Sequence, residues 1–288
     1  MTQNLLLGSH MSISGGMYRA FERAAQTGCT TMQVFTKNNN RWDSRPYSPG
    51  DVEQYLLAAA RSPVGPVFAH CTYLINLCAV DRDVLRRSRA ALQDELGRCE
   101  ALGISGLIVH PGSHVGAGEG DGIRRIAESL NVTHAQTPKY RTLSILETTA
   151  GQGSSIGYRF EQLSGIIDQV DKKDRMAVCF DTCHVFAAGY DISTTGGWDE
   201  TIGAFDDVVG LRRLAAIHVN DSRKALGSRV DRHDHIGKGK IGLTGFRALM
   251  NDPRLANVPK ILETEKSDDM HEDIENMNVL RSLISVVT

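Results

Sequence analysis

Residues 106–114 read GLIVHPGSH, a strand-length apolar run that stops at His110 and is followed at once by Pro111 and Gly112. A short apolar run closed by proline and glycine is typical of a buried strand that ends in a loop. Residues 143–147, LSILE, repeat the arrangement with Glu147 as the last residue. The recurring unit is therefore a buried strand whose final side chain is polar.

Runs of this kind are spread along the whole chain. They recur about every 30 to 40 residues, which is the length of a strand followed by a helix. The predicted strands are Leu5–Gly8, Met32–Phe35, Val67–His70, Gly106–His110, Leu143–Glu147, Met176–Asp181, Leu214–Val219 and Lys260–Glu263.

The segments between these runs carry helix signals. A proline and an acidic residue near the start predict a helix over Pro49–Arg61. Asp81 is predicted to cap a helix whose apolar face continues to Leu102. Thr244 is predicted to cap the helix that runs through Met250.

Alternating strands and helices with right-handed connections close most simply into a barrel. We therefore predict an α/β fold in which residues 1–288 form a single (β/α)8 TIM barrel domain, with its active site at the carboxyl ends of the strands. An open, doubly wound sheet is the alternative. It is disfavoured because polar side chains follow six consecutive strands, whereas an open sheet binds its ligand at one switch point.

The composition, with 41% hydrophobic and 23% charged residues, is that of an ordinary soluble protein. The six cysteines lack a C-x-x-C pair, which favours reduced, buried thiols. The start does not resemble a signal peptide and no apolar run reaches about 18 residues, so we expect a cytoplasmic protein without a membrane partner. The net charge of −2 argues against a polyanionic partner unless bound cations add positive charge at the site.

The polar residues at the strand ends form a set that suits metal binding. Four carboxylates at one barrel mouth would repel one another, and divalent cations are the natural compensation. Imidazole and carboxylate ligands favour zinc, with manganese or iron as alternatives. Nine candidates exceed what one or two tetrahedral ions need, so we predict a trinuclear centre suited to phosphodiester hydrolysis. The candidates are His70, His110, Glu147, Asp181, His184, His218, Asp231, His233 and Glu263.

Longer strings surround these residues: GSH at 8–10, SGG at 14–16, FTKN at 35–38, HPGSH at 110–114, ETTAGQG at 147–153, DTCHVFAAGYD at 181–191, HVND at 218–221, GSRVDRH at 227–233 and LET at 262–264. Through them the chain resembles, over nearly its whole length, the endonuclease IV family of zinc-dependent apurinic/apyrimidinic endonucleases. The resemblance implies DNA repair by hydrolysis 5′ to an abasic site, leaving a 3′-hydroxyl and a 5′-deoxyribose phosphate.

The resemblance also implies three Zn²⁺ ions per chain, with Mn²⁺ as a possible substitute. The implied ligand groups are His70, His110 and Glu147; Glu147, Asp181, His218 and Glu263; and His184, Asp231 and His233. Among the candidate catalytic groups we favour Glu263 over the bridging Glu147 for handling the proton. The expected partner is double-stranded DNA with abasic sites or 3′-blocked ends, bound by a monomer that needs no protein partner.

A loop after the second predicted strand offers a cation, amides and an aromatic ring for phosphate contact and stacking, at Lys37, Asn40, Arg41 and Trp42. The family uses this loop to enter the minor groove. Its members usually space arginine and tryptophan by one residue, whereas Arg41 and Trp42 are adjacent here. Either Asn40 or Arg41 therefore fills the wedge position.

Two further loops are expected to contact DNA. The resemblance makes Tyr73, beside Leu74, an inserting residue, and such side chains refill the gap that an extrahelical abasic nucleotide leaves. Arg229 and Arg232 belong to a basic loop suited to backbone phosphates.

Two other functions fit part of this pattern. A metal-dependent sugar isomerase or epimerase on the same barrel would also carry His, Asp and Glu at strand ends, but would need only one or two ions. The group of His184, Asp231 and His233 and the basic loop disfavour it. A non-catalytic protein that binds damaged DNA is the second alternative.

Overall fold

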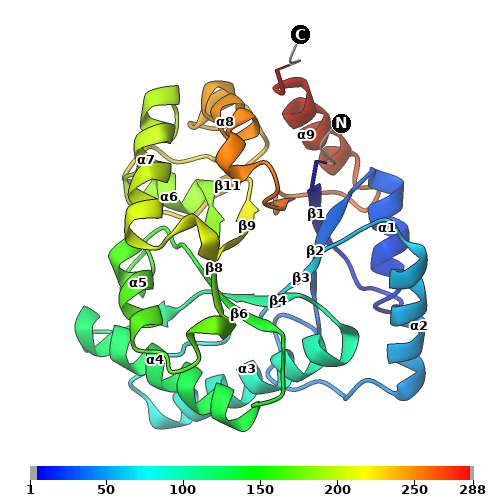
Figure 1. Cartoon of the computed structure of the whole chain (residues 1–288), viewed down its shortest axis with the longest axis vertical. Coiled ribbons are helices and arrows are strands. Elements are labelled where there is room, and N and C mark those ends of the chain that lie inside the picture. Colours follow the sequence, from blue (N-terminus) through cyan, green and yellow to red (C-terminus); the bar gives the residue numbers. More distant parts are fainter. Residues whose placement is uncertain (1–4, 286–288) are drawn as a thin grey trace.

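Parallel strands close into a barrel in the computed structural model, which describes residues 5–285 (Figure 1). The barrel strands are β1 (Leu7–Met11), β2 (Thr31–Phe35), β3 (Val67–His70), β4 (Gly106–Val109), β6 (Leu143–Glu147), β8 (Met176–Asp181), β9 (Leu214–His218) and β12 (Lys260–Leu262). Their order is β1-β12-β9-β8-β6-β4-β3-β2, and β2 pairs with β1 to close the ring. The predicted TIM barrel is confirmed, and the open sheet is wrong.

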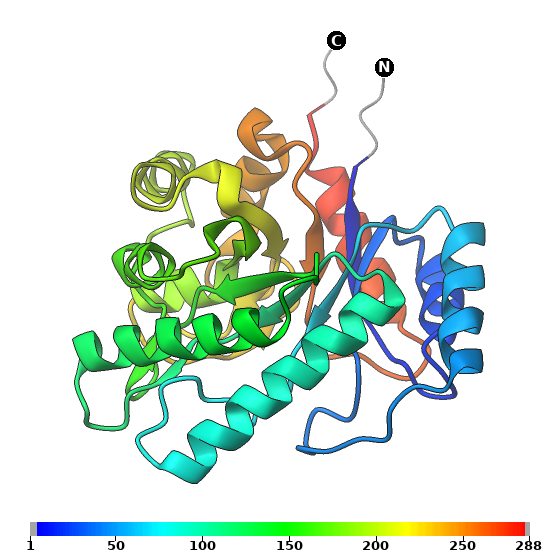
Figure 2. The same ribbon diagram turned by 60° about the horizontal axis from the view of Figure 1, so that its bottom comes forward.

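Helices follow the strands and surround the barrel (Figures 1 and 2). They are α1 (Arg19–Thr27), α2 (Pro49–Arg61), α3 (Arg82–Leu102), α4 (Glu119–Gln136), α5 (Phe160–Asp168), α6 (Thr182–Ala188), α7 (Thr195–Val208), α8 (Gly242–Asn251) and α9 (His271–Ser282). The last helix packs against α1 and β1, so the two ends of the described chain meet. Within residues 5–285, no helix has the length and apolar character needed to cross a bilayer.

The loops that follow the barrel strands contain short strands, which pair with one another. β5 (Gly112–Ser113) pairs with β7 (Ser155–Ile156), and β10 (Asp221–Ser222) pairs with β11 (His233–Asp234), both antiparallel. The second pair ties the loop that contains His233 to the end of β9. Short 3-10 turns at Lys173–Arg175, Leu211–Arg213 and Pro253–Leu255 precede β8, β9 and β12.

The first strand differs from the prediction. It begins at Leu7 rather than Leu5 and continues past Gly8 to Met11. Polar Ser9 lies inside the strand because its hydroxyl finds buried partners: it donates to Asp273 Oδ1 at 2.8 Å, and Leu262 O is 3.2 Å away. The sequence pattern ended the strand at the first polar residue, and that rule fails where a distant partner satisfies the polar group. The other seven strands begin and end within one residue of the prediction.

Two of the three predicted helix starts are confirmed. Helix α2 spans Pro49–Arg61, and Asp81 caps α3 by accepting from two backbone N–H groups. The predicted cap at Thr244 is wrong, because α8 begins at Gly242 and places Thr244 in its first turn. Asp221 accepts from the backbone N–H of Ile241 at 3.0 Å, so a carboxylate from another loop fixes the chain just before this helix.

The core has two parts. A large apolar cluster lies between the strands and the helices, and a small one fills the barrel interior. The six cysteines are free and buried, as predicted. The buried members of the interior cluster are Phe68, Ile108, Ile145, Ala177, Cys179, Ala216 and Ile261.

Candidate metal centre

The barrel interior places six of the predicted ligands in one layer. Alternate side chains of a strand face the same side of the sheet, so a residue two positions after an interior residue also faces inward. On each of six strands an interior apolar residue is followed, two positions later, by a predicted ligand in the strand or just after it. The pairs are Phe68 and His70, Ile108 and His110, Ile145 and Glu147, Cys179 and Asp181, Ala216 and His218, and Ile261 and Glu263.

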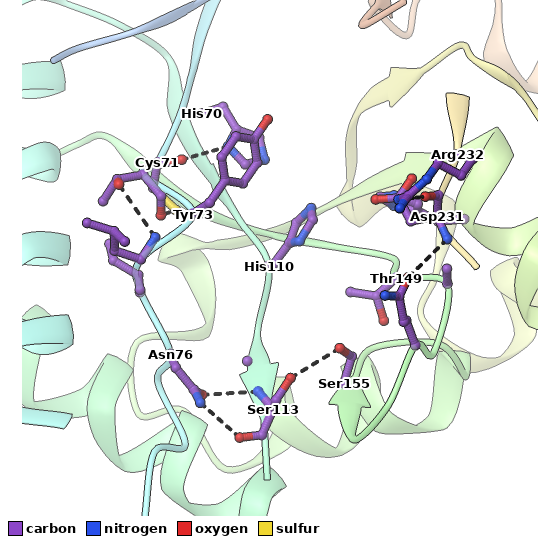
Figure 3. Close-up of a pocket in the computed structure, with 17 residues that line it drawn as sticks. His70, Cys71, Tyr73, Asn76, His110, Ser113, Thr149, Ser155, Asp231 and Arg232 are labelled. Carbon is purple, nitrogen blue, oxygen red and sulfur yellow. Dashed lines mark hydrogen bonds and ion pairs between the residues drawn. The ribbon is translucent and has the colours of Figure 1, made fainter. Parts of the chain in front are cut away.

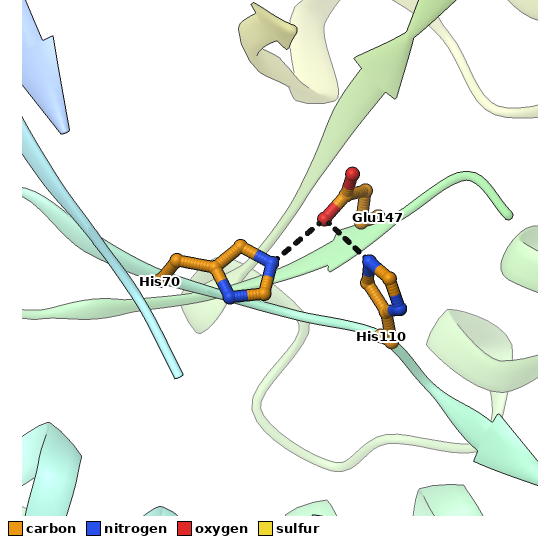
Figure 4. A group of neighbouring side chains, drawn as sticks. All are labelled: His70, His110 and Glu147. Atoms are coloured by element: carbon orange, nitrogen blue, oxygen red, sulfur yellow. Dashed lines mark hydrogen bonds and ion pairs between the residues drawn. The ribbon is translucent and has the colours of Figure 1, made fainter. Parts of the chain in front are cut away.

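One group of ligands converges on a single carboxylate oxygen. Glu147 Oε2 lies 3.0 Å from His70 Nε2 and 3.2 Å from His110 Nε2 (Figure 4). Ligand atoms on a tetrahedral zinc ion with ordinary bond lengths stand about 3.3 Å apart. The spacing therefore fits one shared cation. His70 and Glu147 are buried, whereas His110 lies partly open to solvent.

The second oxygen of Glu147 faces a different group. Glu147 Oε1 lies 2.9 Å from His218 Nδ1, and Glu263 Oε2 lies 3.1 Å from the same nitrogen. Asp181 Oδ2 is 3.8 Å away. One imidazole nitrogen thus faces three carboxylates, and Glu147 stands between two candidate cation positions.

A third group lies beyond Asp181. Asp231 places Oδ2 at 3.1 Å from His184 Nε2 and Oδ1 at 3.3 Å from His233 Nε2. Both nitrogens are buried, yet neither makes a well-directed hydrogen bond within residues 5–285. Buried polar atoms nearly always have a partner. A cation between the two rings and Asp231 would supply it.

In three histidines the ring nitrogen Nδ1, which lies away from the proposed cation, donates a hydrogen bond to a backbone carbonyl. A carbonyl oxygen can only accept, so Nδ1 carries a proton and Nε2 is the nitrogen left to bind a cation. The pairs are His70 with Cys71 O at 2.8 Å, His184 with Thr148 O at 2.8 Å and His233 with Glu263 O at 3.3 Å.

The charges of the centre perturb one another strongly. Burial raises the pKa of Glu147, but the positive charges of His218 and His110 outweigh it and hold that pKa well below its ordinary value. Burial lowers the pKa of His218, whereas Cys179, Glu263 and Glu147 raise it well above its ordinary value. Protons on the imidazoles therefore balance the carboxylates in the metal-free protein, and divalent cations could take their place.

Three residues of this centre were missed by the sequence interpretation. His10 and Gln33 are paired in register on β1 and β2 and complete the interior layer. Gln33 Nε2 donates to Glu263 Oε1 at 2.6 Å. Asn220 donates to Asp181 Oδ2 at 2.8 Å and accepts from the backbone N–H of Glu263 at 2.8 Å. The two-residue alternation along each strand was a usable signal for His10 and Gln33.

A pocket of about 480 Å³ opens beside the centre. His110 stands between its His70 and Tyr73 side and its Asp231 and Arg232 side (Figure 3). The Tyr73 side chain is 60% exposed, and its ring centroid lies 5.4 Å from that of His70. Leu74 also lines the pocket. Tyr73, the predicted inserting residue, and Leu74 beside it therefore lie at the edge of the metal-binding groups.

Lys37 is not available for phosphate contact, which corrects the prediction. Its side chain is 1% exposed, and Nζ donates to Trp42 O at 2.9 Å and to Asp94 Oδ2 at 3.2 Å. Glu95 Oε1 is 3.5 Å away. The lysine holds the loop after β2 against α3, because two acidic residues of that helix draw its charge inward.

The Trp42 ring already has contacts within the protein. Its ring packs against the core, and the Arg87 guanidinium lies 4.5 Å from the ring centroid. This ring therefore anchors the loop, and the Arg87 cation lies against it. Asn40 and Arg41 are exposed.

The basic loop before β11 presents two exposed arginines. The Arg229 guanidinium lies 4.7 Å from the Tyr158 ring centroid, and Arg232 donates to Asp231 O at 2.7 Å. Arg232 lines the pocket, next to the third ligand group. Both cations remain open on the side where the strands end.

Comparisons with known proteins agree with this arrangement. A family model described as a xylose isomerase-like TIM barrel matches residues 21–283. A protein named probable endonuclease 4 from Geobacter sulfurreducens is 48% identical over 281 residues, 98% of this chain and 95% of the relative. One of the same name from Chloroflexus aurantiacus is 46% identical over 96% of this chain and 97% of the relative.

Solved structures extend the comparison. The crystal structure of endonuclease IV from Thermus thermophilus superposes with a TM-score of 0.86 at 36% identity, over 96% of this chain and 98% of that one. A D-tagatose 3-epimerase-like protein superposes with a TM-score of 0.73 at 15% identity, over 97% of each chain, and shares the fold alone. With its full-length relatives and the matching barrel, the chain belongs to the endonuclease IV family, within the xylose isomerase-like TIM barrels.

Proposed function

We propose that this protein is a metal-dependent endonuclease that hydrolyses the phosphodiester bond 5′ to an abasic site in double-stranded DNA. Its products are a 3′-hydroxyl and a 5′-deoxyribose phosphate. The observation that carries the proposal is the position of Glu147, whose two oxygens face two separate ligand groups. Membership of the endonuclease IV family supports the same activity.

The ligand groups are suited to three zinc ions. Each group combines imidazole nitrogen with carboxylate oxygen, and its ligand atoms lie within 4.8 Å of one another. Such a donor set favours zinc, and manganese can substitute. Bound there, the ions would acidify a water molecule, neutralise the phosphate and stabilise the leaving oxygen. The three groups are His70, His110 and Glu147; Glu147, Asp181, His218 and Glu263; and His184, Asp231 and His233.

Glu263 is the better candidate for moving the proton. Its side chain is 13% exposed, whereas those of Glu147 and Asp181 are fully buried. A general base must come within hydrogen-bond reach of the group whose proton it takes. Among these three carboxylates, Glu263 is the one that a water molecule or a phosphate could approach from the mouth.

Exposed residues around the mouth would bind the duplex. Tyr73 and Leu74, next to His70, would fill the gap in the base stack that an extrahelical abasic nucleotide leaves. Arg41 or Asn40 would enter the minor groove from the loop after β2. Arg229 and Arg232 would hold phosphates, while Lys37 is excluded by its burial.

One chain supplies every proposed metal ligand, and all three ligand groups are therefore formed within it. We therefore propose that the protein acts as a monomer, on DNA in the cytoplasm, and that duplexes with abasic sites or 3′-blocked ends are its substrates.

The test is incision of a duplex with one synthetic abasic site, with the ends of the products identified. The proposal predicts a 3′-hydroxyl on the upstream fragment and loss of incision after prolonged chelation. A sugar epimerase would instead convert a ketose and leave the duplex intact. A protein that only binds damage would shift the duplex without cutting it. Either result would overturn the proposal.

A further inference from the structure

Gln33 is a buried polar residue at the centre of the barrel mouth. It lies on β2, is fully buried, and is paired in register with Phe68 of the interior cluster. Its side chain therefore faces the interior of the barrel. A buried amide without partners would destabilise the fold, so its contacts must account for its presence.

The amide joins two members of one ligand group. Gln33 Nε2 lies 2.6 Å from Glu263 Oε1, and Gln33 Oε1 lies 2.7 Å from His218 Nε2. The carboxylate can only accept, so the amide nitrogen must face it. The amide oxygen then faces His218. Reversing the amide would set two oxygens against each other at 2.6 Å, so chemistry fixes its orientation.

This orientation fixes the protonation of His218. The amide oxygen can only accept, so His218 Nε2 carries a proton and donates it. Nδ1, which lies among Glu147, Glu263 and Asp181, is then the nitrogen whose proton a cation would replace. Among the hydrogen bonds of residues 5–285, the one to Gln33 Oε1 is the bond made at His218 Nε2. Gln33 thus selects the tautomer that can bind a cation.

The same amide also sets the Glu263 carboxylate. Gln33 Nε2 shares its protons between Glu263 Oε1 and His10 Nδ1, which lies 2.8 Å away. One oxygen of Glu263 is thereby held toward β2, and the other faces His218 at 3.1 Å. His10 accepts from the same amide and keeps it from rotating. Gln33 therefore fixes, from the side of β2, the orientation of the carboxylate that we assign to proton transfer.

From these contacts we infer that Gln33 is a positioning residue for the metal centre: it holds His218 in the metal-binding tautomer and Glu263 in its working orientation. The inference rests on the proposed function. Residues that orient metal ligands in this way change metal affinity or activity by about 10 to 100-fold when they are replaced. An effect of that size is expected at Gln33, although it touches no ion.

The test compares two variants with a matched control. Gln33→Met keeps the volume and removes both hydrogen bonds. Gln33→Asn keeps the amide but shortens the side chain, so it cannot reach Glu263 and His218 together. The control is Gln162→Met, which removes another buried amide whose oxygen accepts from the backbone N–H groups of residues 157–159.

Three quantities are measured: zinc retained against graded chelator, kcat and KM on abasic duplex, and the ring nitrogen resonances of His218. Both Gln33 variants should release zinc at about 10 to 100-fold lower chelator concentration. Their kcat should fall by a larger factor than KM rises. The Nε2–H resonance of His218 should shift, because this proton loses its hydrogen-bond acceptor. Gln162→Met should affect thermal stability alone.

The outcomes separate the inference from the proposed function. If the unmodified protein retains no zinc, the proposed function fails. If it retains zinc and both Gln33 variants match it in retention, kcat and His218 tautomer, the inference alone is overturned. Should Gln33→Met fail to fold, Gln33→Asn decides, because it preserves the polarity of the site.

Discussion

Glu147 Oε1 lies 2.9 Å from Nδ1 of His218, although 71 positions separate the two residues and β8 stands between their strands. The other oxygen of Glu147 faces His70 and His110. A side chain in this position belongs to two ligand groups at once. Its charge should therefore affect the number of bound metal ions more than the charge of a ligand that belongs to one group.

Glu147→Gln should therefore reduce the metal content by more than one ion per chain. An amide offers one neutral oxygen, so neither of the two adjoining groups keeps its shared anionic ligand. We expect the zinc content measured by elemental analysis to fall by at least two ions per chain, with incision lost. Glu100→Gln is the control, because this carboxylate accepts from the backbone N–H groups of Arg141 and Thr142 instead. Full zinc content in Glu147→Gln would refute the bridging role.

Glu263→Gln tests the assignment of the proton-transfer group. The substitution keeps the shape of the side chain but removes the base, so at full zinc loading the binding of abasic DNA should persist while cleavage is abolished. Binding is measured by fluorescence anisotropy, cleavage by gel assay and zinc by elemental analysis. Retained turnover with full zinc content would exclude Glu263 from the role.

Metal binding should release protons at neutral pH. Burial lowers the pKa of His184, but Asp181 and Asp231 raise it well above its ordinary value, so the metal-free protein holds a proton there. Metal binding requires the neutral ring. Affinity should therefore rise with pH until the raised pKa is passed. Calorimetry in two buffers of different ionisation enthalpy measures the release, and identical heats in both would contradict it.

The same raised pKa has an opposite effect on the metal-free fold. An imidazole whose pKa is raised by folding stabilises the protein fully below its unfolded value of about 6.5, and that stabilisation is lost as the pH rises through the folded pKa. The metal-free protein should thus become less stable in thermal melts as the pH rises above neutrality. The zinc-loaded protein should not follow this trend.

Lys37 and Arg41 should behave in opposite ways, although both are cations of one loop. Lys37→Met leaves Glu95 buried without its counter-ion, so unfolding should become about 3 kcal/mol easier while the salt dependence of DNA binding stays unchanged. Arg41→Ala should leave stability unchanged and lower the salt slope by about 0.9 if the arginine contacts one phosphate.

Chemical denaturation and salt titrations of binding measure the two effects. A changed salt slope in Lys37→Met would show that the lysine reaches DNA after all. An unchanged slope in Arg41→Ala would show that this arginine neutralises no phosphate.

The strand ends could be predicted from the sequence because each apolar run is short and stops at a polar residue. That rule located His70, His110 and Glu147 in the structure without any knowledge of the barrel order. It failed at β1, where Ser9 and His10 continue the strand. The partners of Ser9, Leu262 and Asp273, lie 253 and 264 positions away, and no local pattern shows them.

The role of a charged side chain was harder to predict than its position. Lys37 reads as a loop cation, but Asp94 and Glu95 reach it from α3, 57 or more positions later in the chain. Gln33 reads as one polar residue in an apolar strand. Its role depends on His218 and Glu263, which the closure of the barrel brings to it. Whether residues 1–288 act as a single domain stays a prediction.

The most direct test of the proposed activity is to reload metal-stripped protein with zinc while measuring incision of a duplex that contains one abasic site. We expect no incision at zero zinc, full activity at three bound ions per chain, and a cut only on the 5′ side that leaves a 3′-hydroxyl. Incision by the metal-free protein, or an intact duplex at full zinc loading, would contradict it.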